Sequence, residues 1–374
     1  MMDILIVTQD FPPESGGIQT YVLELARGFI ARGHAVRVIC PGKSSDANPL
    51  PGLRDLRRLA VPSSFLFLRL LGYLPGYLRR NPGITHVLYA QWQAAAAESF
   101  RFRGTGSKRR KSFCLVHGRE LLTSVFGPLA PYLMRRTFAR LDAAFPNSRE
   151  VLRLTRAKAT PRCPLYLAHP GVDPELFRPA DSAYLRARYG LGQAPVVVSI
   201  TRMVARKNLR GLIEALPAIR AAAPGTVLIL GGTGPEREGL MAFAEASGLA
   251  GSVHFPGRIP DGEMAAHYSL ADVFALPSLA TDQDVEGFGI VYLEAGACEV
   301  PVVGGLAGGV PDAVSDGETG LLVDPSDTAR LAEAIGGLLR DRDRARAMGR
   351  RARARILESF TWTAASDRML EWMR

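Results

Sequence analysis

The chain has 374 residues, of which 47% are hydrophobic and 22% are charged, and its formal net charge at pH 7 is +10. This length suggests two domains, and the composition excludes an intrinsically disordered chain. No apolar run reaches the roughly 18 residues that a membrane-spanning helix needs. The N-terminus lacks a basic segment with a cleavage site, so we interpret it as a first strand and not as a signal peptide.

Charge and cysteine content narrow the class of partner. The excess of Lys and Arg favours nucleotide phosphates, nucleic acid or an acidic lipid surface. Nucleic acid ranks last because no recognised binding motif accompanies the charge. The 4 cysteines have no CxxC spacing, so neither a zinc site nor a disulfide framework is indicated. We therefore expect a cytoplasmic protein with reduced, buried cysteines.

The N-terminal half opens with a strand over residues 3–8, a glycine-containing loop, a helix over 18–32 and a strand over 35–40. This order is typical of a doubly wound α/β sheet. Gly16 and Gly17 come just before the helix, where they allow the backbone to approach a phosphate or sugar closely. The glycines do not form GxGxxG, so a nicotinamide enzyme is not indicated. A plain turn is the alternative interpretation of the pair.

Residues 41–80 are predicted to be irregular and then helical from residue 63, and strand-like segments follow at 84–90, 112–116, 143–146 and 165–168. His117 and Gly118 directly follow one of these strands, so they should face the crevice where such sheets bind ligands. The helix at 63–80 combines apolar residues with Arg69, Arg79 and Arg80, and a basic cluster spans residues 101–111. Two interpretations are open: a membrane-surface patch, or a core helix with a solvated basic loop.

The C-terminal half repeats the pattern. Strands are predicted at residues 196–200, 227–230, 253–255, 273–276, 301–304 and 320–323, with helices at 209–222 and 290–298 among them. The predicted fold class is therefore α/β, with two facing Rossmann-like domains and a cleft between their strand ends. We place the first domain at residues 1–180, the second at 181–355, and a final helix at 356–374 that packs back on the first domain.

Two acidic residues bracket the helix at 290–298. Glu286 precedes a Gly-Phe-Gly turn, in a loop where free backbone N–H groups at the helix N-terminus can hold a polar ligand. Glu294 lies inside an apolar helix, where a carboxylate is costly unless it has a partner. One interpretation is a structural acid paired with an Arg, and the other is a ligand contact.

Two cations, Arg202 and Lys207, lie beyond the strand at 196–200, on a loop that enters a helix. Fixed cations at such a position suit a diphosphate, which arginine can bind in bidentate fashion. Surface charges at a helix start are the alternative.

These features together resemble the family-4 retaining glycosyltransferases of the GT-B fold. The matching pieces occur in the family's order over nearly the whole chain. They are Gly16-Gly17, His117-Gly118, Asn147-Ser148, Pro170-Gly171-Val172-Asp173, Arg202 with Lys207, Gly257, Glu286-Gly287-Phe288-Gly289 with Glu294, Gly308-Gly309 and Gly317 with Gly320. Within the family, Asp10-Phe11-Pro12-Pro13 and the run from Asp284 to Glu294 look most like the phosphatidylinositol mannosyltransferases.

The resemblance implies roles for individual residues. His117, Glu286, Arg202 and Lys207 would be catalytic: His117 near the transferred sugar, Glu286 on its hydroxyls, and the two cations on the leaving diphosphate. Glu294 would accept hydrogen bonds from ribose hydroxyls. The remaining donor-binding residues would be Gly16, Gly17, Gly257, Arg258, Ile259, Phe288, Gly289 and Ile290, largely through their backbone.

The substrates are implied in the same way: a hexose, best assigned as mannose from GDP-mannose, and a lipid or glycolipid acceptor such as a phosphatidylinositol mannoside. No metal and no cofactor is expected, since Arg202 and Lys207 can replace a cation. The enzyme would work in the cytoplasm, peripherally on the inner face of the cell membrane, on an anionic surface. Two alternatives remain: the same fold with a UDP-sugar and a soluble or polysaccharide acceptor, and a non-catalytic nucleotide-sugar-binding scaffold.

Overall fold

The computed structural model describes residues 1–13, 16–43, 48–100, 110–124 and 126–374. The chain forms two compact units: unit 1 contains Met1–Gly171 and Trp362–Arg374, and unit 2 contains Val172–Thr361. The boundary between the two units lies after Gly171, earlier than the predicted boundary after residue 180. Val172 already belongs to unit 2, where its N–H donates to Phe360 O at 2.8 Å. For the same reason residues 356–361 stay with unit 2, and only the last helix returns to unit 1.

Unit 1 contains a six-stranded parallel sheet with the order β3-β2-β1-β4-β5-β6. Its strands are β1 (Asp3–Val7), β2 (Ala35–Pro41), β3 (Asp55–Leu59), β4 (His86–Tyr89), β5 (Lys111–Val116) and β6 (Ala143–Pro146). Strands β1, β4 and β6 are buried along their whole length. This burial explains why they are continuous apolar runs in the sequence.

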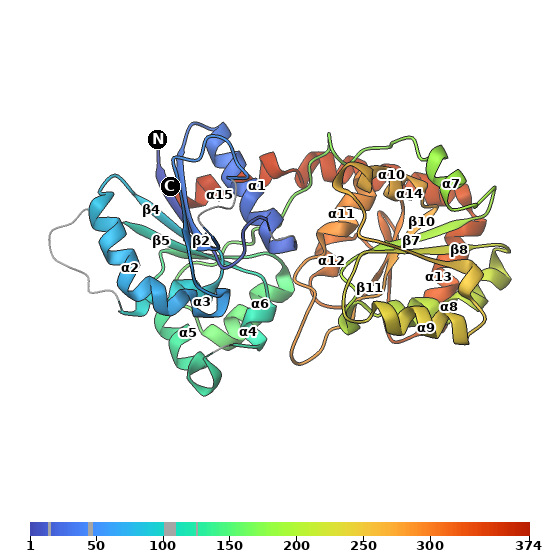
Figure 1. Ribbon diagram of the computed structural model, residues 1–374, viewed down its shortest axis with the longest axis horizontal. Helices are drawn as coiled ribbons and strands as arrows, with labels where there is room; N and C mark the ends of the chain where they lie inside the picture. Colours follow the sequence, from blue (N-terminus) through green and yellow to red (C-terminus); the bar gives the residue numbers. More distant parts are fainter. Residues whose placement is uncertain (14–15, 44–47, 101–109, 125) are drawn as a thin grey trace. The chain divides into compact units, whose positions relative to one another are not determined.

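Helices cover both faces of this sheet, with α1 and α15 together on one face and α2, α3 and α5 on the other (Figure 1). The helices of unit 1 are α1 (Gly17–Ala31), α2 (Leu66–Arg80), α3 (Trp92–Ala95), α4 (Arg119–Leu122), α5 (Ala130–Phe138), α6 (Arg149–Ala159) and α15 (Trp362–Met373). Short 3-10 segments are η1 (Ser63–Phe65), η2 (Ala96–Phe100) and η3 (Gly127–Leu129).

Helix α15 is held to unit 1 by ring stacking and close helix packing. The Trp372 ring stacks on Tyr166 with centroids 5.3 Å apart and on Phe145 at 6.0 Å. A Cβ atom on Gly28 of α1 would lie 2.0 Å from Ser366 Oγ, so the two helices approach closely only because residue 28 is glycine.

Unit 2 contains a second six-stranded parallel sheet with the order β12-β11-β10-β7-β8-β9. Its strands are β7 (Val196–Ile200), β8 (Val227–Gly231), β9 (Val253–Gly257), β10 (Val273–Leu276), β11 (Val302–Gly305) and β12 (Gly320–Val323). Both sheets have the strand order of a doubly wound dinucleotide-binding fold. The prediction of two Rossmann-like α/β domains is therefore confirmed.

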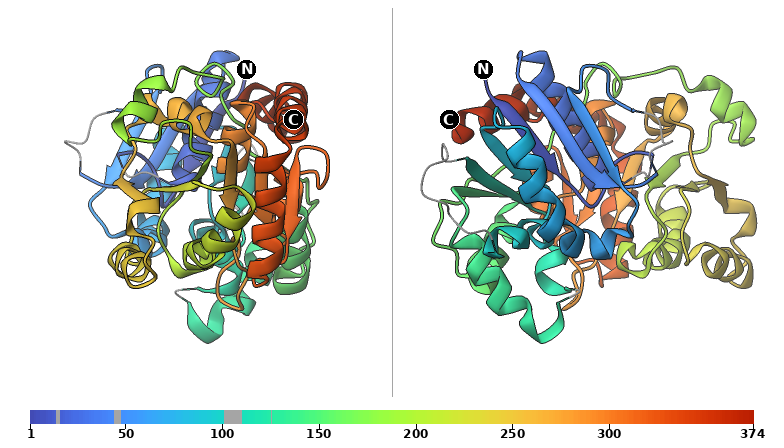
Figure 2. Two further views of the ribbon diagram at one scale, coloured as in Figure 1. Left: turned by 90° about the vertical axis from the view of Figure 1, so that its right-hand side faces the viewer. Right: turned by 60° about the vertical axis from the view of Figure 1, so that its left-hand side comes forward.

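In unit 2, α8 packs on α13 and α11 packs on α14, on opposite faces of the sheet, and Figure 2 shows the same layers from two further sides. The helices are α7 (Ala183–Arg188), α8 (Leu209–Ala222), α9 (Arg237–Ala246), α10 (Met264–Leu270), α11 (Ile290–Ala297), α12 (Val310–Ala313), α13 (Thr328–Arg340) and α14 (Arg342–Ser359). The 3-10 segments are η4 (Ala205–Lys207), η5 (Ala250–Ser252) and η6 (Asp261–Glu263).

One local prediction is wrong and another is confirmed only in part. Strand β3 lies within the segment that was expected to be irregular. Residues 165–168 are not a full strand, but they pair with β6 through the bridge from Leu165 to Ala144 and through the N–H groups of Tyr166 and Ala168, which donate to Ala144 O and Pro146 O. Strand β3 is an edge strand with the sequence DLRRL, which has neither an apolar run nor a regular alternation. Residues 165–168 lie between Pro164 and Pro170, which have no N–H to extend a ladder.

Among the described residues, no helix is both long and apolar enough to cross a membrane. The 15-residue helix α2, which combines apolar residues with arginines, contains Pro75 and ends in two arginines.

Candidate active site

The two strands at the centre of the unit 2 sheet, β7 and β10, lie at the point where the strand order reverses. Ligands of open α/β sheets bind beyond the carboxyl ends of the strands at this point. Strand β7 leads into η4, which ends at Lys207, and β10 leads through Ser278 to the loop that carries Glu286. The sheet therefore brings together residues that are 79 positions apart in the chain.

Glu286 lies at the centre of a buried charge cluster. The Lys207 ammonium contacts Glu286 Oε2, and Arg206 Nη1 lies 2.8 Å from the same oxygen. The Ser278 hydroxyl donates to Oε2 as well, at 3.3 Å. Arg206 also pairs through Nε with Asp284 Oδ2 at 3.1 Å. Two cations and two carboxylates thus form one cluster, and three donors converge on a single oxygen of Glu286.

The protonation states follow from this arrangement. Burial alone would raise the pKa of Glu286, but Lys207 and Arg206 outweigh it and hold that pKa at about 2. Burial lowers the pKa of Lys207, and the Glu286 charge opposes this shift. Glu286 is therefore ionised at neutral pH, and in the described part of the chain its Oε1 has no hydrogen-bond partner. This oxygen can accept a hydrogen bond from a ligand hydroxyl.

Glycines shape the loop that carries Glu286. Gly289 has φ +91°, and a Cβ atom there would lie 2.5 Å from the Tyr292 ring. Gly308 has φ +57°, and a Cβ atom there would lie 2.5 Å from the backbone oxygen of Glu286. Only glycine tolerates these conformations and contacts. The Gly309 N–H then donates to Glu286 O at 2.8 Å, so the glycine pair at 308–309 fixes the Glu286 backbone.

Helix α11 begins at Ile290, directly after this turn. The first N–H groups of a helix have no partner within the helix and carry a partial positive charge. The backbone of Gly289 and Ile290 can therefore bind an electronegative atom close to Glu286. The Phe288 side chain instead packs into the core of unit 2, so that only its backbone is suited to a ligand.

Glu294 has a tyrosine as its partner, and not the arginine that one interpretation required. The Tyr268 hydroxyl donates to Glu294 Oε2 at 2.5 Å. Burial raises the pKa of Glu294 to about 7, and the Tyr268 hydrogen bond offsets only part of that shift. Ligand hydroxyls that donate hydrogen bonds to this buried carboxylate would stabilise its ionised form.

Binding of a nucleotide sugar is therefore expected to weaken as the pH falls below 7. The free carboxyl of Glu294 has a pKa of about 7, and ribose hydroxyls favour its ionised form, so the affinity should rise with pH up to this value and level off above it. We expect binding about tenfold weaker at pH 6 than at pH 8. Isothermal titration with a nucleotide sugar is suitable, because its esterified diphosphate does not titrate in this range. Glu294→Gln should abolish the pH dependence, and an unchanged slope in this variant would contradict the assignment.

The other predicted residues of unit 2 lie at the carboxyl ends of β7 and of the edge strand β9. Arg202 is exposed in the loop after β7. The Gly257 carbonyl accepts a hydrogen bond from Gly232 N at 2.7 Å, Ile259 is buried, and the Arg258 side chain is 69% exposed. Their roles as donor contacts stay predictions.

Gly16, Gly17 and His117 belong to unit 1, at the carboxyl ends of its strands. Gly16 precedes the first residue of α1, and the expected loop includes Glu14 and Ser15, which lie outside the described residues. His117 is buried, with Nε2 2.9 Å from Ala90 O and its ring edge-on to Tyr21. Because a carbonyl only accepts, Nε2 is the donor in this contact, which fixes the orientation of the ring.

Three residues of the site were missed by the sequence reasoning: Arg206, Asp284 and Tyr268. Arg206 is adjacent to Lys207, and a second cation at a predicted phosphate site was the available signal. Asp284 marks the start of the run that resembles the mannosyltransferases, but the sequence assigns it no role. Nothing in the sequence links Tyr268 with Glu294, since they come from different helices, α10 and α11.

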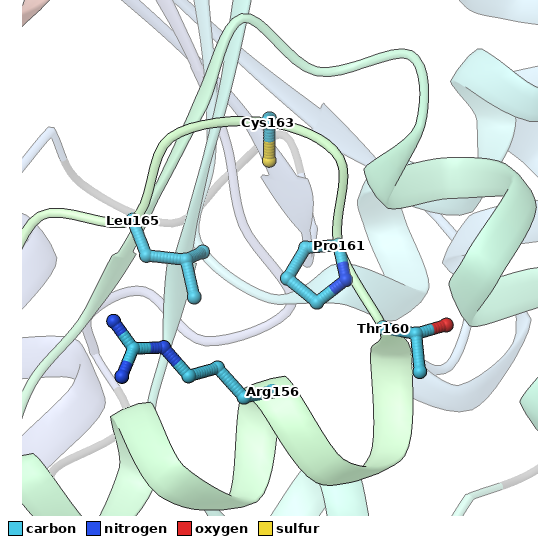
Figure 3. A pocket seen from close by; sticks show the side chains of 5 residues that line it. All are labelled: Arg156, Thr160, Pro161, Cys163 and Leu165. Carbon is cyan, nitrogen blue, oxygen red and sulfur yellow. The ribbon is translucent and has the colours of Figure 1, made fainter.

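A separate hollow in unit 1, with a volume of about 420 Å³, contains none of the predicted site residues. Figure 3 shows its lining, which is Arg156, Thr160, Pro161, Cys163 and Leu165. Cys163 is half-buried, whereas the three other cysteines are buried as expected. Burial raises the pKa of the Cys163 thiol to about 11, so it is not a reactive thiolate at neutral pH.

Comparisons with known proteins agree with this geometry. Residues 15–176 match the family model "Glycosyltransferase Family 4", and residues 184–355 match "Glycosyl transferases group 1". The chain is 37% identical, over 100% of its length and 98% of the relative's, to a GDP-mannose-dependent alpha-(1-6)-phosphatidylinositol monomannoside mannosyltransferase of Mycobacterium tuberculosis. The protein of the same description in Mycolicibacterium smegmatis is 38% identical, with 98% and 97% of the two chains covered.

The chain therefore belongs to the family-4 glycosyltransferases. Among solved structures, sucrose-phosphate synthase from Thermosynechococcus elongatus superposes with a TM-score of 0.83 at 25% identity, covering 99% of this chain and 98% of that one. The predicted family and the GT-B fold are confirmed by these matches. So is the prediction that the protein is an enzyme, a hexosyltransferase.

Proposed function

We propose that this protein is a retaining mannosyltransferase that moves mannose from GDP-mannose to a phosphatidylinositol mannoside. The observation that carries the proposal is the full-length similarity to the mycobacterial relatives, whose names state this donor and this acceptor class. The charge cluster around Glu286 supports it, because its residue types are those that a sugar diphosphate needs.

In the proposed reaction, the bond between the anomeric carbon and the diphosphate oxygen breaks, the acceptor hydroxyl oxygen forms the new glycosidic bond, and the proton of that hydroxyl passes to the departing diphosphate. Arg202 and Lys207 stabilise the negative charge that develops on the departing diphosphate, the largest electrostatic requirement of this step. Oε1 of Glu286 and the backbone N–H groups at the start of α11 bind sugar hydroxyls. Glu294 holds the ribose, and His117 contacts the transferred sugar.

The nucleotide sugar is tested by a thermal-shift panel. The true donor raises the melting temperature by mass action, since it binds the folded state only. We expect the largest shift with GDP-mannose. A larger shift with a UDP-sugar would overturn the donor assignment and favour the alternative of a UDP-sugar with a soluble or polysaccharide acceptor.

We expect transfer to proceed without a metal ion. The two cationic side chains supply the positive charge that a divalent cation provides in other transferases. Activity in an excess of EDTA should equal activity in magnesium or manganese. A loss of activity in EDTA that added metal restores would contradict this expectation.

The lipid acceptor and the anionic membrane surface are supported by exposed apolar side chains on unit 1. Phe65, Leu68, Leu129 and Tyr132 are 56–64% exposed. Leu68 is part of α2 and Tyr132 is part of α5, and Phe65 and Leu129 directly precede these two helices. Both helices pack against η2. Arg69 and Arg135 are exposed on the same two helices. The predicted basic cluster begins directly after η2, and its residues 101–109 lie outside the described part of the chain.

We expect the double variant Leu68→Ser, Arg69→Ser to bind anionic vesicles about tenfold less tightly, because it removes one apolar and one cationic contact. The matched control is Leu357→Ser, Arg346→Ser, which makes the same exchange on the exposed surface of α14 in unit 2. Co-sedimentation with phosphatidylglycerol vesicles measures both. Equal binding by the two variants would contradict this surface, and no binding by the wild type would count against a lipid acceptor.

A further inference from the structure

Arg206 is the one cation of the buried cluster that contacts both carboxylates. Its Nη1 lies 2.8 Å from Glu286 Oε2 and its Nε lies 3.1 Å from Asp284 Oδ2. Its side chain is 19% exposed, so these contacts are poorly screened by water. The backbone of Arg206 is fixed too, since its carbonyl accepts the N–H of Leu279, which follows β10, at 2.8 Å.

We propose that Arg206 is a positioning residue of the donor site, which compensates the charge of Glu286 so that Lys207 can bind the donor diphosphate. This inference rests on the proposed function. Arg206 has no role among those predicted from the sequence or in the proposed reaction.

The charges of the cluster carry the argument. Asp284 and Glu286 contribute two negative charges, and Arg206 and Lys207 contribute two positive charges, so the cluster is neutral. If Arg206 is removed, the net charge becomes −1, and the Lys207 ammonium is then the single cation left next to the Glu286 carboxylate within this cluster. A diphosphate approaching Lys207 would meet an excess of negative charge. With Arg206 in place, Lys207 can share its three N–H donors between Glu286 and the phosphate oxygens.

The geometry also explains why the position suits arginine. A guanidinium presents several N–H groups in a rigid plane and can reach two carboxylates from two different nitrogens, whereas an ammonium is a point charge. Arg206 thereby fixes the loop from Asp284 to Glu286 and leaves Oε1 of Glu286 free for a sugar hydroxyl. Lysine at position 206 would keep the charge but lose the bridge.

The test measures GDP affinity by isothermal titration in the full chain. Arg206→Met should weaken GDP binding about tenfold, because it leaves the cluster with an uncompensated charge. Adding Glu286→Gln to Arg206→Met returns the cluster to neutrality and should restore the wild-type affinity to within about threefold. Adding Asp284→Asn is a second route to the same neutrality, should the first double variant not fold. Arg206→Lys should bind GDP normally and yet transfer sugar slowly.

The control is Arg210→Met, on the next helix, where Arg210 pairs with the exposed Glu214 at 3.0 Å. It should bind GDP as the wild type does. Rescue by charge removal distinguishes the proposal from a purely structural role, because a damaged loop would not regain affinity when a second residue is changed. Wild-type affinity in Arg206→Met, or a loss that neither second substitution restores, would overturn the inference. Absence of GDP binding by the wild-type chain would instead contradict the proposed function, and this inference with it.

Discussion

Replacing Lys207 with methionine is expected to lower kcat/KM for sugar transfer by about 10³-fold. Methionine fills most of the space of the lysine stem but cannot stabilise the leaving diphosphate. Glu286 keeps Arg206 and Ser278 as partners, so the buried carboxylate is not left unpaired and the fold should persist. Initial rates with GDP-mannose and a melting curve measure the two quantities.

The matched control for this substitution is Lys158→Met on the exposed surface of α6. It removes the same charge from the chain, and thus tests whether the loss of activity follows from net charge alone. Transfer by Lys158→Met should equal that of the wild type. Substantial activity in Lys207→Met would mean that Lys207 does not stabilise the leaving group.

Glu286→Gln is expected to reduce kcat by a comparable factor while GDP still binds. The variant loses the carboxylate oxygen that accepts the sugar hydroxyl, but it leaves Lys207 more available to the diphosphate. Affinity for GDP should therefore rise or stay constant, whereas turnover falls. If Glu286→Gln binds GDP more weakly but keeps the full kcat, Glu286 does not bind the sugar hydroxyl.

The same variant has a stability consequence with a definite sign. The pKa of Glu286 is lowered in the folded chain from 4.5 to about 2. Its ionised form therefore stabilises the fold fully above pH 4.5, and this contribution is lost as the pH falls from 4.5 towards 2. Denaturation curves of wild type and Glu286→Gln should differ at pH 7 and converge in this acidic range.

The sequence predicts the sheets well because buried parallel strands are continuous apolar runs. The helix predicted at residues 209–222 and the strands at 196–200 and 273–276 have the same bounds in the structure. Strand β3 was missed because an edge strand needs no apolar run, and Asp55–Leu59 is mostly charged. The fold class can thus be predicted from the core strands. An edge strand forms by pairing with its neighbour, and its own sequence need not show an apolar pattern.

The position of the site could be predicted in part because the core strands of the sheet were predicted. Strand ends at a switch point converge, so both Lys207 and Glu286 could be expected beyond such strand ends. Their ion pair was not predicted, and the resemblance alone assigned them to one ligand. The direction in which each side chain points could not be predicted from the sequence, because it depends on the turn of η4 and on the glycine conformations at positions 289 and 308. That is why Arg206 was passed over although it is adjacent to Lys207. Tyr268 was missed because its contact with Glu294 joins two helices.

We propose that the Lys207–Glu286 site transfers mannose from GDP-mannose to a lipid acceptor. The most direct measurement incubates the purified chain with radiolabelled GDP-mannose and phosphatidylinositol monomannoside, and follows label entering the lipid fraction, with Lys207→Met in parallel. We expect a lipid product with one additional α-linked mannose for the wild type and almost none for the variant. If the label stays in the aqueous phase with this donor, while a UDP-sugar transfers its sugar under the same conditions, GDP-mannose is not the donor and the proposed reaction is wrong.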